Sequence, residues 1–315
     1  MTDSLAPPEI GPVPGPAAGA DAGADAGAES GRPLVGVVLM LAAMAALPFI
    51  DVLAKFLGQA GVPILLVVWA RLTFGALVTL PFALRLTSPR GLMPNRLVYH
   101  ILRAGLLSLA TFSFFLALKH LPIADALAIF FVQPLVVTVL SALVLKERVG
   151  PRRWAAVGVG FLGTLIIIRP GFAAFNPGSL LAFAAGSFLA VYLVMTRRIS
   201  GTAPAMLTTF HTSAVGAVLI SFLLPLVWQT PTLPQWLMMA ALGTIATLGH
   251  FLIVRAYDFA EASLLAPLAY TEMIMATLAG WVFFGDFPDV LTFLGVAILI
   301  ACALYISWRE RASTA

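Results

Sequence analysis

Residues 34–57 read LVGVVLMLAAMAALPFIDVLAKFL, and the first 17 of them carry no charged side chain. A helix that crosses the hydrocarbon core of a bilayer needs about 20 consecutive, mainly apolar residues. The backbone of such a segment has no water to bind, so its N–H and C=O groups must be satisfied within a helix. This stretch therefore predicts a membrane-spanning helix.

The composition of the whole chain points the same way. Of the 315 residues, 61% are hydrophobic and only 10% are charged, and the mean hydropathy is +1.01. About a quarter of the residues of a soluble domain are charged. A transmembrane barrel requires segments of about ten residues with alternating polarity, and the apolar runs here do not alternate. The expected fold class is an all-α integral membrane protein.

Apolar runs bounded by charges, glycines or prolines predict ten transmembrane helices. They cover residues 34–57, 62–84, 97–118, 122–145, 152–169, 178–196, 203–228, 234–254, 262–284 and 290–308. Residues 1–33 are rich in Pro, Gly and Ala, so we expect a disordered cytoplasmic tail there. This tail has neither the pattern of a signal peptide nor that of an organellar transit peptide. The expected location is the bacterial inner membrane.

Lys and Arg are distributed unevenly between the predicted helices. With the N-terminus placed inside, the cytoplasmic segments hold 13 of these residues, and the outer ends hold only Lys119 and Arg169. Cytoplasmic loops carry an excess of Lys and Arg. Both termini, including a short tail of residues 309–315, are therefore predicted to be cytoplasmic. The same distribution accounts for the net charge of +4 without a nucleic-acid partner.

The two halves of the chain resemble each other at a shift of about 140 residues. Pro63 aligns with Pro204 at a shift of 141, and residues 124–126 (Ala-Asp-Ala) align with residues 260–262 (Ala-Glu-Ala) at a shift of 136. The predicted repeats are residues 34–171 and 172–308. Five helices per repeat is an odd number, so the second repeat must be inverted in the membrane. Inverted repeats around a site near the midplane recur in alternating-access transporters.

Three stretches resemble the drug/metabolite transporter superfamily of the EamA type. They are Asp51-Val-Leu-Ala-Lys55 with Trp69-Ala-Arg71, residues 117–171 with ALKHLPIADALAIFFVQPL and LKERVGPRRWAAVGVGFLGTLIIIRPG, and residues 266–289, APLAYTEMIMATLAGWVFFGDFPD. The first stretch is similar to the proteobacterial branch that includes riboflavin and S-adenosylmethionine carriers. The resemblance implies ten helices in two repeats around a central cavity. Glu272 departs from the uncharged polar residue of several members.

Eight polar residues in the predicted helices are candidates for substrate binding or coupling, because ionisable groups in a bilayer face a bundle interior or a cavity. They are Asp51, Lys55, Arg71, Gln133, Tyr192, His211, Tyr270 and Glu272. Asp51 shares a helix face with Lys55 and is expected at a depth similar to that of Arg71. These three residues form either an ion cluster that fixes two helices or a site where a basic side chain receives an anionic substrate group.

The remaining candidates carry their own alternatives. Glu272 has no basic residue within four positions, and it is predicted either to bind a proton or a cationic substrate or to hydrogen-bond a neighbouring helix. Gln133 precedes Pro134, which predicts a kink, and Gln133 can bind a solute or join two helices. Further kinks are predicted at Pro48 and Pro267. Four residues rank lower because they are expected near the cytoplasmic ends, where arginine can snorkel to the surface. They are His100, Arg103, His250 and Arg255.

The sequence offers no pattern for catalysis. It contains no G-x-x-x-x-G-K-[ST] phosphate loop and no His, Cys and carboxylate cluster at metal-ligand spacing. We expect no cofactor and no metal, and Cys302 is interpreted as a packing residue. The leading hypothesis is a secondary carrier, not an enzyme, that uses alternating access and a proton or solute gradient. The alternatives are a membrane-embedded lipid-modifying enzyme and a channel or non-transporting scaffold.

The expected partners follow from the carrier hypothesis. They are a small-molecule metabolite and membrane lipid, and the candidate substrates are riboflavin, S-adenosylmethionine and amino acids. A side-chain set with Arg71, Lys55, Glu272 and aromatic rings suits a polar, amphoteric or aromatic-ring metabolite. Whether the chain forms a homo-oligomer stays an open question, because apolar surfaces that face lipid and those that face a second copy look alike in sequence.

Overall fold

The computed structural model describes residues 33–87, 92, 96–144, 146, 150–170, 176–198, 204–260 and 262–312. Every element assigned in these residues is helical. The predicted N-terminal tail lies outside the described residues apart from Pro33. Of the predicted C-terminal tail, residues 309–312 continue the last helix and residues 313–315 lie outside the description.

Six segments are long and apolar enough to cross a membrane. They are α2 (Pro33–Ala46) with α3 (Pro48–Gln59), α4 (Ile64–Leu86), α5 (Leu97–Ala117), α6 (Ile123–Phe130) with α7 (Gln133–Val144), α9 (Gly178–Arg198) and α11 (Leu233–Phe259). Shorter apolar helices make up the rest. They are α8 (Pro151–Ile168), α10 (Ala205–Ser221), α13 (Thr271–Phe284) and α14 (Val290–Ala312), with the short pieces η2 (Leu224–Leu226), α12 (Ala262–Leu265) and η3 (Ala266–Tyr270).

The helix boundaries lie close to the predicted ones, and the largest difference has a simple cause. The helix predicted over residues 203–228 ends at Ser221, and Pro225 lies in the short helix η2 that follows. A proline ring clashes with the carbonyl four positions earlier, which here belongs to Ser221. Pro225 therefore explains why α10 stops before the end of the apolar run.

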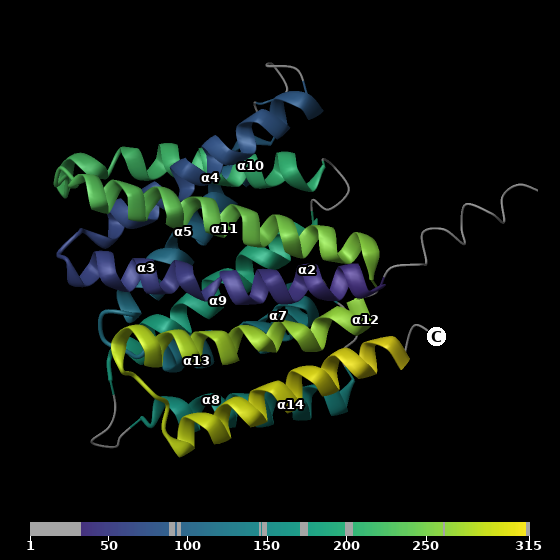
Figure 1. Ribbon diagram of the computed structural model, residues 1–315. Coiled ribbons are helices and arrows are strands. Elements are labelled where there is room, and N and C mark those ends of the chain that lie inside the picture. Colours follow the sequence, from purple (N-terminus) through teal and green to yellow (C-terminus); the bar gives the residue numbers. More distant parts are fainter. Residues whose placement is uncertain are drawn as a thin grey trace, which may run out of the picture.

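The helices lie side by side in one bundle (Figure 1). α5 packs along α9, α4 along α10 and α8 along α14, while α11 packs against both α2 and α4. α2 begins and α14 ends at the same end of the bundle, which we call the tail end. The opposite end, where α3 finishes and α13 turns into α14, is called the far end.

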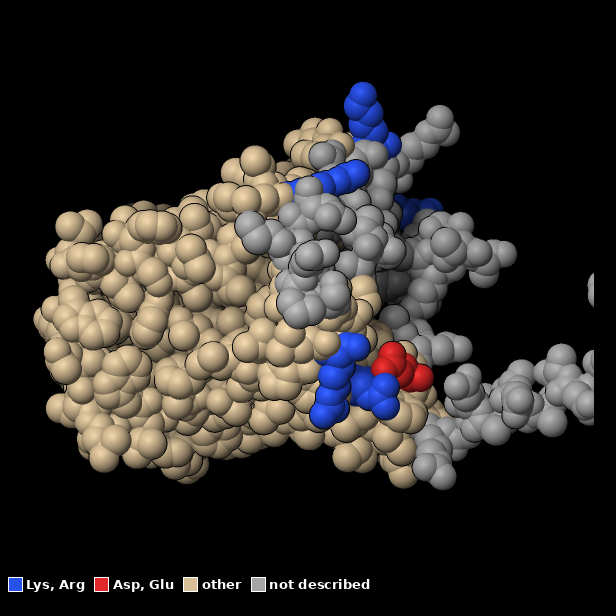
Figure 2. All heavy atoms as spheres, turned by 90° about the horizontal axis from the view of Figure 1, so that it is seen from above, with Lys and Arg blue, Asp and Glu red and all other residues tan. Residues whose placement is uncertain are grey.

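The surface of the bundle suits a lipid environment. Large apolar side chains are exposed along the helices, among them Leu102, Val218 and Val282. On the face in Figure 2, Lys and Arg side chains gather toward the tail end with acidic side chains beside them, and the described surface toward the far end is uncharged. Apolar surface of this extent is hidden by lipid in membrane proteins and is rare on soluble monomers. The protein is an all-helical integral membrane protein.

Glycines allow α8 and α14 to approach closely. A Cβ built on Gly295 of α14 would lie 2.7 Å from the carbonyl O of Gly163 in α8. A Cβ on Gly163 would lie 2.9 Å from Cγ2 of Ile298. Small residues are enriched where transmembrane helices cross, because they let the two backbones come together.

Three segments are interrupted within the bundle. Leu47 separates α2 from α3, residues 131–132 separate α6 from α7, and η3 separates α12 from α13. Each interruption lies at a proline for which the sequence predicts a kink, at Pro48, Pro134 or Pro267. These interruptions place helix starts inside the bundle, which matters for the polar residues described next.

Candidate functional site

Two interrupted segments carry a carboxyl group in the first turn of their second half. Asp51 lies in the first turn of α3, and Glu272 lies in the first turn of α13. The backbone stays helical through both starts, because Leu47 and Tyr270 just before them keep α-helical dihedral angles. Gln133 is the first residue of α7. Three of the eight predicted polar residues therefore lie at starts of half-helices inside the bundle.

Asp51 is coupled both to Arg71 of α4 and to Glu272. Asp51 interacts electrostatically with both Glu272 and Arg71, and its side chain is buried. Nη1 of Arg71 donates a hydrogen bond to Oγ1 of Thr111 in α5. Arg71 makes no salt bridge to an acid among the described residues. One guanidinium and two carboxyl groups thus lie near one another without a closed ion pair between them.

Ionisable side chains at and around Arg71 keep accessible surface. Arg71 and Glu272 are half-buried and His250 of α11 is exposed, although protein surrounds all three. His250 interacts electrostatically with Arg71. A side chain deep within a bundle keeps accessible surface only where it borders an internal space. We call Asp51, Arg71, Glu272 and His250 the central cluster.

Tyr192 of α9 connects the central cluster to a second arginine. It interacts electrostatically with Arg71. Its Oη also accepts a hydrogen bond of 3.4 Å from Nη2 of Arg103 in α5. Tyr192 is half-buried and lies between the two guanidinium groups.

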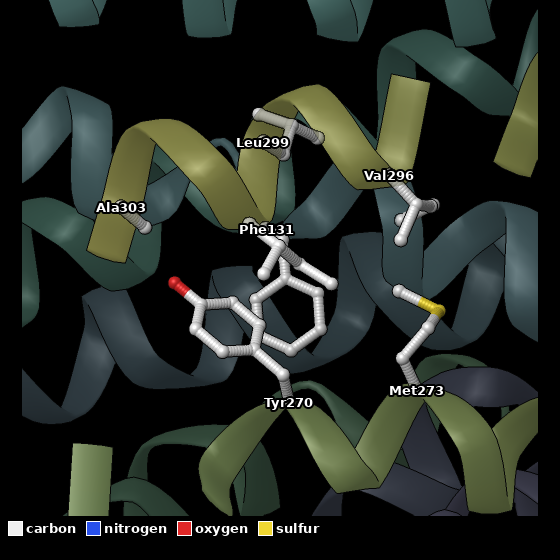
Figure 3. Close-up of a pocket in the computed structure, with 8 residues that line it drawn as sticks. Phe131, Tyr270, Met273, Val296, Leu299 and Ala303 are labelled. Atoms are coloured by element: carbon white, nitrogen blue, oxygen red, sulfur yellow. The ribbon is translucent and has the colours of Figure 1, made fainter. Parts of the chain in front are cut away.

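Tyr270 points into an apolar environment. Its ring packs against Phe131, with 5.7 Å between the ring centroids. Together with Met273, Val296 and Leu299 these rings line a cavity of about 10 Å³ between α13 and α14 (Figure 3). A volume of that size is close to that of one water position. The cavity is too small and too apolar to hold a metabolite.

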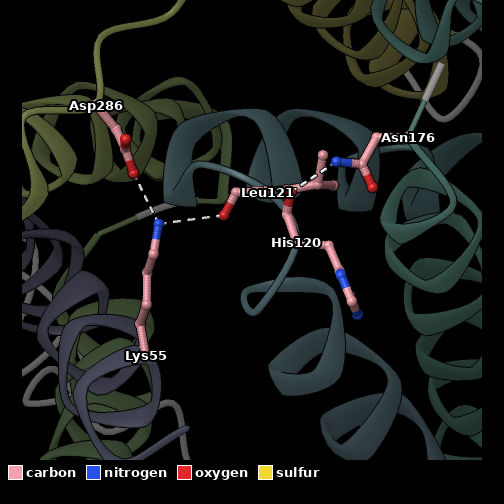
Figure 4. A network of polar contacts seen from close by, with 5 residues as sticks. All are labelled: Lys55, His120, Leu121, Asn176 and Asp286. Carbon is pink, nitrogen blue, oxygen red and sulfur yellow. Dashed lines mark hydrogen bonds and ion pairs between the residues drawn. The ribbon is translucent and has the colours of Figure 1, made fainter. Parts of the chain in front are cut away.

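Lys55 lies at the far end of the bundle, away from the central cluster. Its Nζ is 2.7 Å from Oδ2 of Asp286 and 3.3 Å from the carbonyl O of Leu121 (Figure 4). The ammonium also lies 4.7 Å from the centroid of the Phe284 ring. Lys55 therefore ties α3 to the turn before α6 and to the link between α13 and α14. It does not complete an ion cluster with Asp51 and Arg71.

A polar hollow of about 280 Å³ adjoins this ion pair. Its wall includes Lys55, Gln59, Lys119, His120 and Asp286. The hollow is open to the outside, and both partners of the ion pair belong to its lining.

A second ion pair closes the same end between α8 and α14. Nη2 of Arg169 contacts both carboxylate oxygens of Asp289, and the backbone N–H of Thr292 donates a 2.9 Å hydrogen bond to Oδ1. These bonds, first the one from Arg169, hold the pKa of Asp289 below its ordinary value of 3.8. Asp289 therefore stays ionised at neutral pH.

His211 belongs to a different group of residues, in the half of the bundle nearer the tail end. Its ring lies 5.1 Å from that of His100 at an angle of 82°. His100 interacts electrostatically with Arg103. The prediction that Arg103 snorkels to the surface is wrong, because its side chain is 0% exposed. α5 is packed between α9 and α10, so this face of the helix meets protein.

Several of these residues escaped the sequence analysis. In the sequence, Asp286 stands out only as part of a stretch that resembles the family. Thr111 is not among the candidates there, and His250 and Arg103 rank low. Asp286 forms its ion pair across 231 positions of the chain, and the sequence has no signal for that distance. Arg103 could have been found, because it is a charge six positions inside a predicted helix.

Comparison with known proteins identifies a family whose sequence pattern matches this chain. The sequence pattern of the EamA-like transporter family matches residues 34–169 and 176–308. A riboflavin transporter of Vibrio cholerae is 30% identical over 287 residues, which cover 90% of this chain and 96% of the relative. An S-adenosylmethionine uptake transporter of Rickettsia bellii is 28% identical, and the match covers 88% of this chain and 94% of the relative.

Two further likenesses are more limited. A pseudopaline exporter, CntI, of Pseudomonas aeruginosa is 30% identical over 60% of this chain and 68% of its own. A solved crystal structure matches with a TM-score of 0.59 and 24% identity, covering 89% of this chain and 99% of that chain. The second likeness concerns the fold alone.

Proposed function

The chain belongs to the EamA-like transporter family, and we propose that it is a secondary carrier of an amphoteric organic metabolite, bound at the central cluster. Its family and its named relatives make it a transporter of a small metabolite in the bacterial inner membrane, not an enzyme. The proposal adds a substrate class, a binding site and a mode of transport.

The observation that carries the proposal is the meeting of opposite charges beside an internal space. Arg71 can hold a carboxylate, and Asp51 and Glu272 can hold a cationic group. Charges within a membrane are costly and mark substrate or ion pathways. The starts of α3 and α13 resemble the discontinuous helices that form midplane sites in transporters. A ligand that carries both charges would satisfy all three groups at once.

S-adenosylmethionine is the first compound to test, because it carries a carboxylate and two cationic groups in one small molecule. Relatives are named for riboflavin and for S-adenosylmethionine, and only the second has this charge pattern. Amino acids share the pattern at smaller size. A carboxyl group bordering the space, that of Glu272, also suits proton coupling, which a dependence of uptake on the pH gradient would reveal.

We further propose that the ten apolar segments form two inverted five-helix repeats. The family pattern matches each half once. The helix contacts pair equivalent segments across the two halves: α4 packs along α10 and α8 along α14. The packing of α5 on α9 is likewise repeated by that of α11 on α2. Such pairing supports alternating access about the central cluster.

In this proposal the tail end is cytoplasmic, in agreement with the excess of Lys and Arg there. The far end is closed in this conformation by the Lys55–Asp286 and Arg169–Asp289 ion pairs. A cysteine placed after residue 312 should then react with an impermeant thiol reagent only from the cytoplasmic side.

Ligand-dependent thermal stabilisation of the purified protein tests the substrate class. S-adenosylmethionine, amino acids and riboflavin are compared on the wild type and on the Arg71→Gln and Glu272→Gln variants. A ligand that binds the folded state at 100 times its Kd stabilises it by about 2.7 kcal/mol. Loss of one charged partner costs about 2 kcal/mol, or roughly 30-fold in Kd.

Arg255→Gln is the matched control, because Arg255 is exposed and pairs with Asp258 on the surface. This variant should keep the full ligand shift. A ligand shift that persists unchanged in both Arg71→Gln and Glu272→Gln would exclude the central cluster as the site.

A further inference from the structure

Arg103 is a fully buried cation that has no carboxylate partner among the described residues. Its side chain is 0% exposed and is the largest of the fully buried side chains in the described residues. Nε donates a 3.1 Å hydrogen bond to Oγ1 of Thr196, and Nη2 donates one of 3.4 Å to Oη of Tyr192. Nη1 is buried and has no hydrogen-bond partner. No described acid forms a salt bridge with this guanidinium.

The histidines beside Arg103 do not supply a negative charge either. His100 interacts electrostatically with it, and the His100 ring stands against that of His211. The face of Tyr192 lies 5.1 Å from the guanidinium carbon, which offsets only part of a buried charge. Arginine stays protonated in proteins. Three nitrogen-rich side chains and one phenol therefore converge without an anion.

The position of this group relates it to the transport path. Tyr192 interacts with Arg71 of the central cluster and bonds to Arg103. Arg71 lies seven positions into α4 from the far end, and Arg103 lies six positions into α5 from the tail end. At a rise of about 1.5 Å per residue these depths are roughly 10 Å from opposite surfaces.

We propose that Arg103, with His100 and Tyr192, forms a second anion site that receives the carboxylate of the solute as it passes from the central cluster to the tail end. The inference rests on the proposed carrier function for the source of the anion. Nη1 is the donor left available for a carboxylate oxygen. Tyr192, which bonds to Arg103 and lies near Arg71, separates the two sites in this conformation and moves aside when the tail-end half opens.

A structural role and a ligand role for Arg103 predict opposite effects on stability. A buried ion that completes a network destabilises the fold when removed, whereas replacing an uncompensated buried charge by an apolar group of similar volume is neutral or stabilising. If the charge of Arg103 serves to bind a ligand, the melting temperature of the Arg103→Met variant should equal or exceed that of the wild type. The same variant should lose the part of its response to a small carboxylate that does not depend on Arg71.

The experiment uses sodium acetate as a carboxylate and acetamide as its neutral isostere, with ionic strength held by a bulky sulfonate salt. Acetate should raise the melting temperature of the wild type by about 2 °C or more beyond acetamide. Part of this shift should persist in Arg71→Gln, where the central cluster is disabled. It should disappear in the double variant Arg71→Gln/Arg103→Met.

Arg103→Gln is the second variant, since glutamine can still bond Thr196 and Tyr192 while lacking the charge. It should fold even if the methionine variant does not, and in the Arg71→Gln background it should abolish the remaining acetate shift in the same way. An acetate shift of Arg71→Gln that survives the addition of either Arg103 substitution, or a wild type without an acetate shift, would overturn the second site. Neither result bears on the carrier function, which fails instead if no solute of the metabolite panel stabilises the wild type.

Discussion

Lys55 and Asp286 are 231 positions apart in the chain, yet their side chains meet at 2.7 Å across the far end of the bundle. Lys55 is almost fully buried and Asp286 is partly exposed, with side-chain accessibilities of 9% and 31%. Exposed ion pairs contribute little to stability, and burying an ion pair costs desolvation free energy. The half-buried pair of Lys55 and Asp286 is intermediate between these two cases. The ion pair spans three elements and is therefore suited to hold the far end closed.

Breaking this pair should weaken closure of the far end. Neutralising either partner, by Lys55→Gln or Asp286→Asn, should shift the conformational balance by about 1 kcal/mol, which is roughly fivefold in an equilibrium constant. We expect a similar fall in initial uptake rate, measured in proteoliposomes. The reversed pair Lys55→Asp/Asp286→Lys should recover part of that loss.

The surface pair Arg255–Asp258 supplies the control for this experiment. Both residues are exposed, so Arg255→Gln should leave the uptake rate unchanged. A reversed pair that transports no better than the worse single variant would mean that Lys55 and Asp286 act separately.

At the scale of single residues, the sequence identifies which charges lie in the membrane but not which of them meet. Asp51, Arg71 and Glu272 are predicted as intramembrane charges, and the structure brings them near one another. Lys55 lies four positions after Asp51, but its ammonium bonds to Asp286. Arg103 resembles a snorkelling residue until α9 and α10 are placed on either side of it. Partners far apart in the chain depend on how helices pack, which a single sequence does not encode locally.

At the scale of the element, prolines make the interruptions predictable. Pro48, Pro134 and Pro267 each coincide with a break, because proline removes a backbone donor and clashes with the preceding turn. The end of α10 follows the same rule through Pro225, which the length of the apolar run concealed. The close crossing of α8 and α14 is less accessible from sequence, since glycines are common in transmembrane helices.

The crossing of α8 and α14 should be sensitive to a single methyl group. A Cβ on Gly295 would lie 2.7 Å from the backbone of Gly163, so Gly295→Ala must push the helices apart. Overpacking of this kind costs about 1–3 kcal/mol. The variant should melt at a lower temperature in detergent, followed by the fluorescence of the tryptophans.

Gly105→Ala is the counterpart of that substitution. A Cβ on Gly105 in α5 has nothing within 4 Å, and alanine is a better helix former than glycine by about 1 kcal/mol. This variant should melt at the same or a higher temperature. Equal effects at both glycines would contradict the close crossing.

At the scale of the whole molecule, composition and hydropathy are enough to predict an all-helical membrane protein with the correct segments. This works because lipid imposes internal hydrogen bonding on any spanning backbone. The internal duplication stays a prediction, based on ordered identities between the halves. The sequence does not reveal that α4 packs along α10 or α5 along α9, and these contacts determine where the interior space lies. The central cluster is a consequence of that packing.

Solute counterflow in proteoliposomes tests the carrier mechanism most directly. Vesicles with reconstituted protein are loaded with unlabelled S-adenosylmethionine or, in parallel, with lysine or riboflavin, and uptake of the same labelled compound is followed. The binding site of an alternating-access carrier reorients faster with a bound solute than without one. Preloading the vesicles is therefore expected to accelerate uptake of an amphoteric solute several-fold. The acceleration should be lost in Arg71→Gln and retained in Arg255→Gln. Uptake that does not saturate and does not respond to preloading would contradict the carrier mechanism and indicate a channel.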